Sequence, residues 1–105
     1  MIGRFAFAAI TLALAPVTWA LETAQAHVTI VETTCMPTSI SFQVDGGTTS
    51  CPVGTWLRWI NANTDNNKAA FALLLAASNG GSRIRYFVNN GDTNCQVQFL
   101  YALSS

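Results

Sequence analysis

The residues that could carry out chemistry are few and widely spaced. Three cysteines, one histidine and five carboxylates are scattered along the 105 residues. A nucleophilic cysteine or serine needs a base held beside it, and His27 is the only histidine that could supply one. The spacing gives no reason to pair two carboxylates for glycoside hydrolysis, and structural zinc needs four cysteine or histidine ligands. We therefore expect no enzyme activity, no cofactor and no metal site.

The cysteines are better suited to a disulfide bond. Cys35, Cys51 and Cys95 allow three single bridges, and each choice leaves one thiol over. We favour Cys51–Cys95, because each of these residues precedes an apolar, strand-like segment and the bridge would join the two halves of the domain. Closing this longer loop stabilises by roughly 4 kcal/mol in the chain-entropy account, against about 3 kcal/mol for a Cys35–Cys51 bridge. Cys35 is then buried, free or available to another chain.

The first 26 residues have the pattern of a secretory signal peptide. Arg4 makes the n-region positive, residues 5–14 form an apolar h-region, and Ala24-Gln25-Ala26 has the small-x-small pattern that signal peptidase accepts. The alternative is an uncut membrane anchor, but the apolar segment is short and Pro16 interrupts the residues after it. We expect residues 27–105 to form one secreted or periplasmic domain without a membrane span, in a compartment where disulfides persist.

The charges of this expected domain cancel. Its basic residues are Arg58, Lys68, Arg83 and Arg85, and its acidic residues are Glu32, Asp45, Asp65 and Asp92. Both kinds are spread along the chain, whereas a nucleic-acid-binding surface normally needs a basic stripe that neutralises phosphates. We therefore expect no nucleic-acid partner.

Apolar periodicity predicts a mainly β domain with one helix. Strands are expected at residues 27–34, 39–44, 55–60, 83–88 and 96–103, and a helix at about 66–78 that Asp65 or Asn66 caps and Gly80-Gly81 ends. The order βββαββ is that of the OB-fold, a small five-stranded Greek-key barrel. An open sheet covered by one helix is the alternative.

The predicted helix is apolar on every face from Ala69 to Ala77. A helix that lies on a solvated sheet normally keeps a polar stripe, and so small a domain has little spare protein to cover a second apolar face. We expect an interface between copies in a homo-oligomer, formed by Phe71, Leu73, Leu74 and Leu75. The alternative is that the small alanines form a tolerable exposed face.

A resemblance covers residues 51–88. This stretch contains a cysteine, a strand with tryptophans, an asparagine-rich loop, the run Lys68-Ala69-Ala70-Phe71-Ala72-Leu73-Leu74-Leu75-Ala76-Ala77, a glycine cap and the basic strand Arg83-Ile84-Arg85-Tyr86-Phe87-Val88. It resembles the small secreted proteins of the toxin B-subunit kind that are related to the B-subunit of subtilase cytotoxin. The resemblance implies an OB-fold, assembly into a ring that binds cell-surface glycans, and delivery of a separate enzymatic subunit. It matches no sugar-contacting residue to a position in this chain.

Residues suited to sugar recognition lie on and beside the predicted turns. Sugars are bound by hydrogen-bonding side chains and by aromatic rings that pack on their C–H faces. The candidates are Trp56, Arg58, Asn61, Asn63, Asp65, Asn89, Asn90 and Asp92. Turns need the same residue types for local reasons, so a purely structural role is the alternative. We expect Trp59 in the core, which leaves Trp56 outward as an interface anchor or a ligand platform.

The leading functional hypothesis is a secreted, non-enzymatic module that binds cell-surface glycans as an oligomeric ring. The rival is a structural or protein-interaction protein of the bacterial envelope, which includes an inhibitor of a secreted enzyme.

Overall fold

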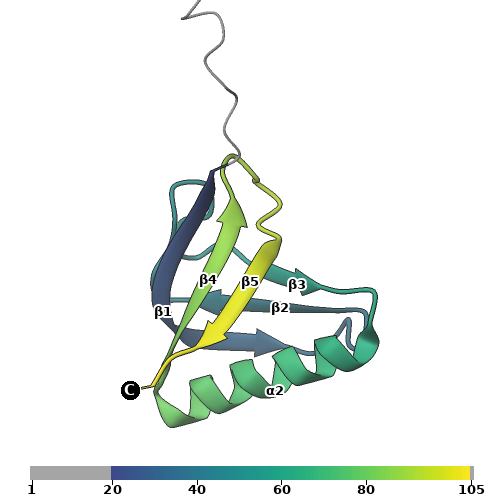
Figure 1. The fold of residues 1–105 in the computed structure, drawn as a ribbon. Helices are drawn as coiled ribbons and strands as arrows, with labels where there is room; N and C mark the ends of the chain where they lie inside the picture. Colours follow the sequence, from purple (N-terminus) through teal and green to yellow (C-terminus); the bar gives the residue numbers. More distant parts are fainter. Residues whose placement is uncertain (1–19, 105) are drawn as a thin grey trace, which may run out of the picture.

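The computed structural model describes residues 20–104, which form one five-stranded antiparallel sheet and one helix (Figure 1). The strands are β1 (Leu21–Glu32), β2 (Ser39–Val44), β3 (Leu57–Ile60), β4 (Arg83–Asn89) and β5 (Val97–Ala102), and the helix is α2 (Thr64–Gly80). The chain is therefore mainly β with the expected order of elements, and the sheet is not closed by continuous pairing. Residues 1–19 of the expected signal peptide lie outside the described residues.

The strand order is β3-β2-β1-β4-β5, so β1 is the central strand. Its first part, Leu21 to His27, pairs with β4, and its second part, Val28 to Glu32, pairs with β2. Figure 1 shows β1 bending between these two parts, so that β4 and β5 run across the direction of β2 and β3. The central strand thus joins two small sheets that lie at an angle to each other.

An extra residue in β1 decides which side chains reach the core. The register shifts between Val28, which pairs with Val44, and Ile30, which pairs with Gln43, so Thr29 is the additional residue of a bulge. Beyond the bulge the alternation reverses: Val31 packs against the core and Ile30 is 45% exposed. Strict alternation over residues 27–34 had predicted that Val28 and Ile30 share a face, and the bulge makes that prediction wrong.

The core lies between the curved sheet and α2. Its largest fully buried side chains come from β2, β3, α2 and β4, and they include Ile40, Phe42, Leu57, Leu74, Ile84 and Tyr86. The helix turns one stripe toward the sheet, formed by Asn67, Ala70, Leu74 and Ala77, which is the spacing that 3.6 residues per turn produces. Figure 1 shows α2 lying below the sheet along its length.

The ends of α2 are set by its caps. The side chain of Asn63 accepts hydrogen bonds from the backbone amides of Asp65 and Asn66, and Gly81 ends the helix in the left-handed conformation at φ 73°. The glycine end was predicted correctly. The prediction of Asp65 or Asn66 as the amino-terminal cap was wrong, because Asn63 accepts the first free amides two residues earlier.

Candidate binding surface

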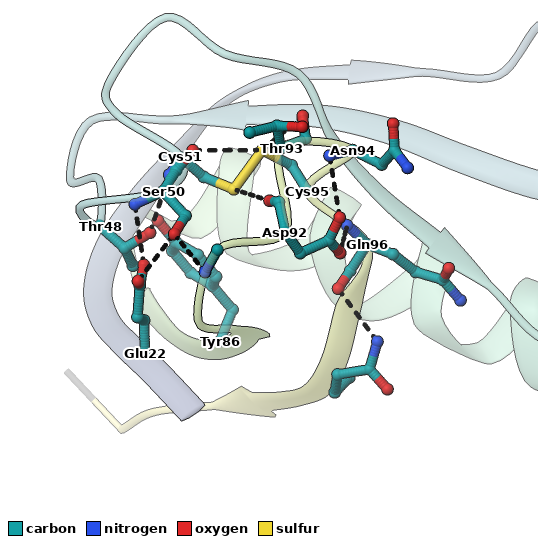
Figure 2. The surroundings of a disulfide bond; sticks show 12 residues. Glu22, Thr48, Ser50, Cys51, Tyr86, Asp92, Thr93, Asn94, Cys95 and Gln96 are labelled. Carbon is teal, nitrogen blue, oxygen red and sulfur yellow. Dashed lines mark hydrogen bonds between the residues drawn. A yellow bond between two sulfur atoms is a disulfide. The ribbon is translucent and has the colours of Figure 1, made fainter. Parts of the chain in front are cut away.

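The disulfide Cys51–Cys95 joins the segment before β3 to the segment before β5 (Figure 2). Both cysteines are buried, and their Cα atoms lie 5.9 Å apart. This is the predicted pairing, and it leaves Cys35 free and exposed. The bridge holds together two loops that are 44 residues apart in sequence, so it fixes one end of the sheet.

Beside the disulfide, the carboxylate of Glu22 fastens the start of β1 to the same loops. Its two oxygens accept hydrogen bonds from the Ser50 backbone amide at 2.9 Å and from the Ser50 hydroxyl at 2.7 Å. The Ser50 hydroxyl oxygen also accepts a bond from the Gly91 amide at 2.7 Å. The Ser50 amide and then its hydroxyl lower the pKa of Glu22, so the group is held as a carboxylate (Figure 2).

Tyr86 lies under this cluster and uses its hydroxyl structurally. The hydroxyl donates to the Gly46 carbonyl at 2.8 Å, and burial, with the nearby charge of Glu22, raises the pKa of Tyr86 to about 12. A Cβ at Gly46 would lie 2.9 Å from the Gln25 carbonyl oxygen, so this turn can pack on β1 only because it lacks a side chain. The phenol therefore stays protonated and serves as a hydrogen-bond donor.

The predicted ligand-binding residues at the start of α2 are engaged in local structure. Asn63 caps the helix, and the side chain of Asn61 accepts a hydrogen bond from the Asn63 amide at 2.9 Å. Asp65 is exposed in the first turn, where its charge favours the positive end of the helix dipole. These three residues thus satisfy turn and cap requirements.

The second predicted group, Asn89, Asn90 and Asp92, lies at the disulfide end of the molecule. The Asp92 carboxylate accepts bonds from the Asn94 amide at 2.9 Å and the Gln96 amide at 3.2 Å, which shapes the turn before β5. Figure 1 shows the tip of this turn at the top of the molecule, away from the start of α2 at the lower right. The structure therefore does not bring the two predicted asparagine-rich loops into one site.

Trp56 and Arg58 are both exposed, as an outward ligand platform requires. The Arg58 amide donates to the Cys95 carbonyl at 3.0 Å, which places this strand beside the start of β5. Trp59 packs against the core, as predicted, and its indole N–H donates to the Asn66 side chain at 3.0 Å. Trp56 is thus the more accessible of the two neighbouring tryptophans.

The four residues of the predicted helix interface differ in how far they are buried. Leu74 is fully buried, while Phe71 and Leu73 are half-buried against the core. Leu75 is 42% exposed and lies outside the buried stripe of α2. The apolar helix is therefore enclosed on one side only within a single chain.

A surface that the sequence analysis missed lies on the outer face of β4 and β5. We call it the aromatic face and define it by Phe87, Phe99 and Tyr101. The Phe87 ring meets the other two edge-on, at centroid distances of 6.0 Å from Phe99 and 5.7 Å from Tyr101. Phe99 and Tyr101 are each 49% exposed, so two rings of this cluster are open to solvent.

Polar side chains border the aromatic face on the same side of the sheet. In the strand register Arg85 lies opposite Tyr101 and Gln25, and Phe87 lies opposite Thr23. The alternation of residues 85, 87, 99 and 101 was the available signal, since every second residue of a strand shares a face. An aromatic centre with a guanidinium, an amide and a hydroxyl beside it can both stack on a ligand and hydrogen-bond to it.

Asn67 is a second residue whose role sequence reasoning missed, and this role is structural. Its side-chain nitrogen donates to the carbonyls of Pro37, Thr38 and Asn61 at 2.7, 3.0 and 2.9 Å. The residue is fully buried, so these bonds join α2 to the two loops that precede β2 and follow β3. A polar residue in the buried stripe at 67, 70, 74 and 77 was the only sequence signal.

The described residues also contain a small apolar hollow of about 170 Å³ between the end of α2 and the end of β5. Its lining is formed by Leu73, Ala76, Ala77, Ser82, Ala102 and Leu103. Within residues 20–104 no group of three or more histidine, cysteine or acidic side chains is placed to hold a metal ion. No helix in that range is long and apolar enough to cross a membrane.

Comparison with protein-family models, with curated proteins and with solved structures gave no match.

Proposed function

We propose that this chain is an extracytoplasmic, non-enzymatic binding module with the topology of an OB-fold. The order β3-β2-β1-β4-β5, with the helix between β3 and β4, is what a five-stranded barrel of this type needs. A parallel bridge between Arg58 and Gln96, with the Arg58–Cys95 backbone bond, supports an approach of β3 and β5 that completes the barrel. The disulfide supports export to an oxidising compartment.

The proposed ligand is a glycan, and the proposed site is the aromatic face. The observation that carries the proposal is the solvent exposure of Phe99 and Tyr101, 49% each, on the outer face of β5. Leaving such rings exposed is costly unless another molecule covers them, and the apolar C–H faces of a sugar fit rings of this size. Arg85, Gln25 and Thr23, which lie beside these rings in the strand register, would bind the sugar hydroxyls.

The test is a glycan-array screen of the purified protein, repeated with the double variant Phe99→Ala and Tyr101→Ala. These side chains are exposed, so the variant should keep the thermal unfolding midpoint of the wild type within a few degrees. We expect the wild type to bind a defined glycan and the double variant to lose it. Trp56→Ala is the matched control, an exposed aromatic outside the aromatic face, and it should bind normally.

Two results would contradict the glycan proposal. One is a wild-type protein that binds no glycan on the array. The other is a double variant that binds the glycan as well as the wild type does, while Trp56→Ala loses binding. That result would place the binding site on the surface beside β3.

Assembly into a homo-oligomer, with a separate enzymatic subunit as a further partner, is part of the proposal. The exposed Leu75 supports a second copy of the chain on the outer side of α2. Sedimentation at micromolar concentration should show an oligomer that Leu75→Glu dissociates without unfolding the chain. A wild-type protein that sediments as a monomer would contradict the proposed assembly into a ring.

The second candidate function is a protein-interaction or inhibitor-like role in the bacterial envelope. The sequence of β5, Val97 to Ala102, carries no charge and lies at the edge of the continuous sheet. Exposed edges of that kind accept a strand from a partner unless charges or prolines protect them. A monomer that binds no glycan but is captured with one exported protein in a defined ratio would favour this function.

A further inference from the structure

The first part of β1 lies inside the expected signal peptide. A cut after Ala26 would separate residues 21–26 from the domain, although six of the seven residue pairs that join β1 to β4 belong to this segment. Only the pair His27–Arg83 would remain. The sheet would then consist of two pieces held together by little more than that pair, the disulfide and the helix.

The side chains of this segment are also built into the domain. Ala26 is 2% exposed and belongs to the core, and Ala24 packs against the core. The Glu22 carboxylate accepts both hydrogen bonds from Ser50 described above. A leader that is discarded during export has no reason to carry a buried side chain and a specific carboxylate contact of the mature fold.

We infer that signal peptidase hydrolyses the bond between Ala20 and Leu21, immediately before the first residue of β1. Thr18-Trp19-Ala20 supplies small residues at the third and first positions before that bond, and a 20-residue leader lies within the usual range. Water adds across the peptide bond, which leaves a carboxylate on Ala20 and an α-amine on Leu21. This inference rests on the proposed export of the chain.

The cut at this position costs the fold little. Ala20 is exposed, and its carbonyl accepts a backbone bond from the Asn90 amide at 2.9 Å. Asn90 is exposed too, so water can replace that carbonyl. All the pairing from Leu21 to His27 with β4 is kept.

The experiment expresses the full chain in a bacterium with an active secretory pathway and determines the amino terminus of the folded, disulfide-bonded product by sequencing and intact mass. We expect Leu21. An amino terminus at His27 would overturn the inference while leaving export intact. An amino terminus at Met1 would overturn the export on which the inference rests, so the two failures are distinguishable.

Two variants test the cleavage site independently of folding. Ala20→Phe places a bulky residue next to the proposed bond and should cause the precursor to accumulate. Trp19→Ala is the matched control, because the position between the two small residues tolerates any side chain, and it should be processed like the wild type. Unchanged processing of Ala20→Phe would overturn the inference.

Discussion

Replacing both Cys51 and Cys95 by alanine should lower the free energy of unfolding by about 4 kcal/mol. The bridge spans a sequence separation of 44, and the chain-entropy relation for a loop of that length gives about 4 kcal/mol at 25 °C. A domain of this size has a free energy of unfolding of roughly 4 to 13 kcal/mol in total. The double variant is therefore expected to lose a large part of its stability, and in the lower part of that range it unfolds near 37 °C.

Urea unfolding in an oxidising buffer measures this loss. Trp59 packs against the core, so tryptophan fluorescence and far-ultraviolet circular dichroism should report the same transition in the wild type. The transition midpoint of the double variant should fall at nearly unchanged slope. Cys35→Ala is the matched control: the residue is exposed and unbridged, and its replacement should change stability by less than about 0.5 kcal/mol.

Three results would refute this reasoning. The first is a loss of stability below about 1 kcal/mol in the double variant, because the loop length would then not determine how much the disulfide stabilises the fold. The second is an equal loss in Cys35→Ala. The third is a thiol titration of the unfolded, unreduced wild type that finds Cys51 or Cys95 reactive in place of Cys35.

Two further predictions concern the polar contacts of Glu22 and Asn67. Glu22→Gln should be less stable than the wild type at neutral pH, because the pKa of Glu22 is lowered in the folded state. The difference in the free energy of unfolding should be constant at pH values above 4.5, the ordinary pKa of a glutamate. It should vanish as the pH falls through the pKa of Glu22 in the folded state. Denaturant titrations of both proteins between neutral and acidic pH measure this, and a constant difference would contradict the role of the carboxylate. Asn67→Ala should cost about 3 kcal/mol, because three backbone carbonyls lose a buried donor. Asn66→Ala, which removes the exposed bond to Trp59, is its control and should cost about 1 kcal/mol or less; equal losses would contradict the buried role of Asn67.

The sequence predicted the order of the regular elements because their signals are local, but it missed residues 21–26 of β1. Alternation gave the bounds of β2 without error, and the glycine end of α2 was correct because only Gly81 tolerates the left-handed conformation there. The disulfide was predictable from the two strand-like segments that come after its cysteines. The strand and helix-end signals need only neighbouring residues.

The features that could not be predicted depend on residues distant in sequence. The partners of Asn67 at positions 37 and 38 are about thirty residues away, and nothing local marks them. The Thr29 bulge is an irregularity that alternation does not foresee, and it changes which side chains of β1 face outward. Ala24-Gln25-Ala26 fits a peptidase site, while small side chains at the same positions are what the core of β1 accepts beside Gly46. The same three residues therefore fit both a peptidase cleavage site and a strand that packs against the core.

The central position of β1 also has a consequence for when the domain can fold. The first residues of this strand find their partners on β4, more than fifty residues later in the chain, so the nascent polypeptide cannot complete its sheet until synthesis has passed Asn89. Contacts of such long range slow folding, because the loop between them must close before any of them forms. The topology thus delays the native state until nearly all of the chain exists.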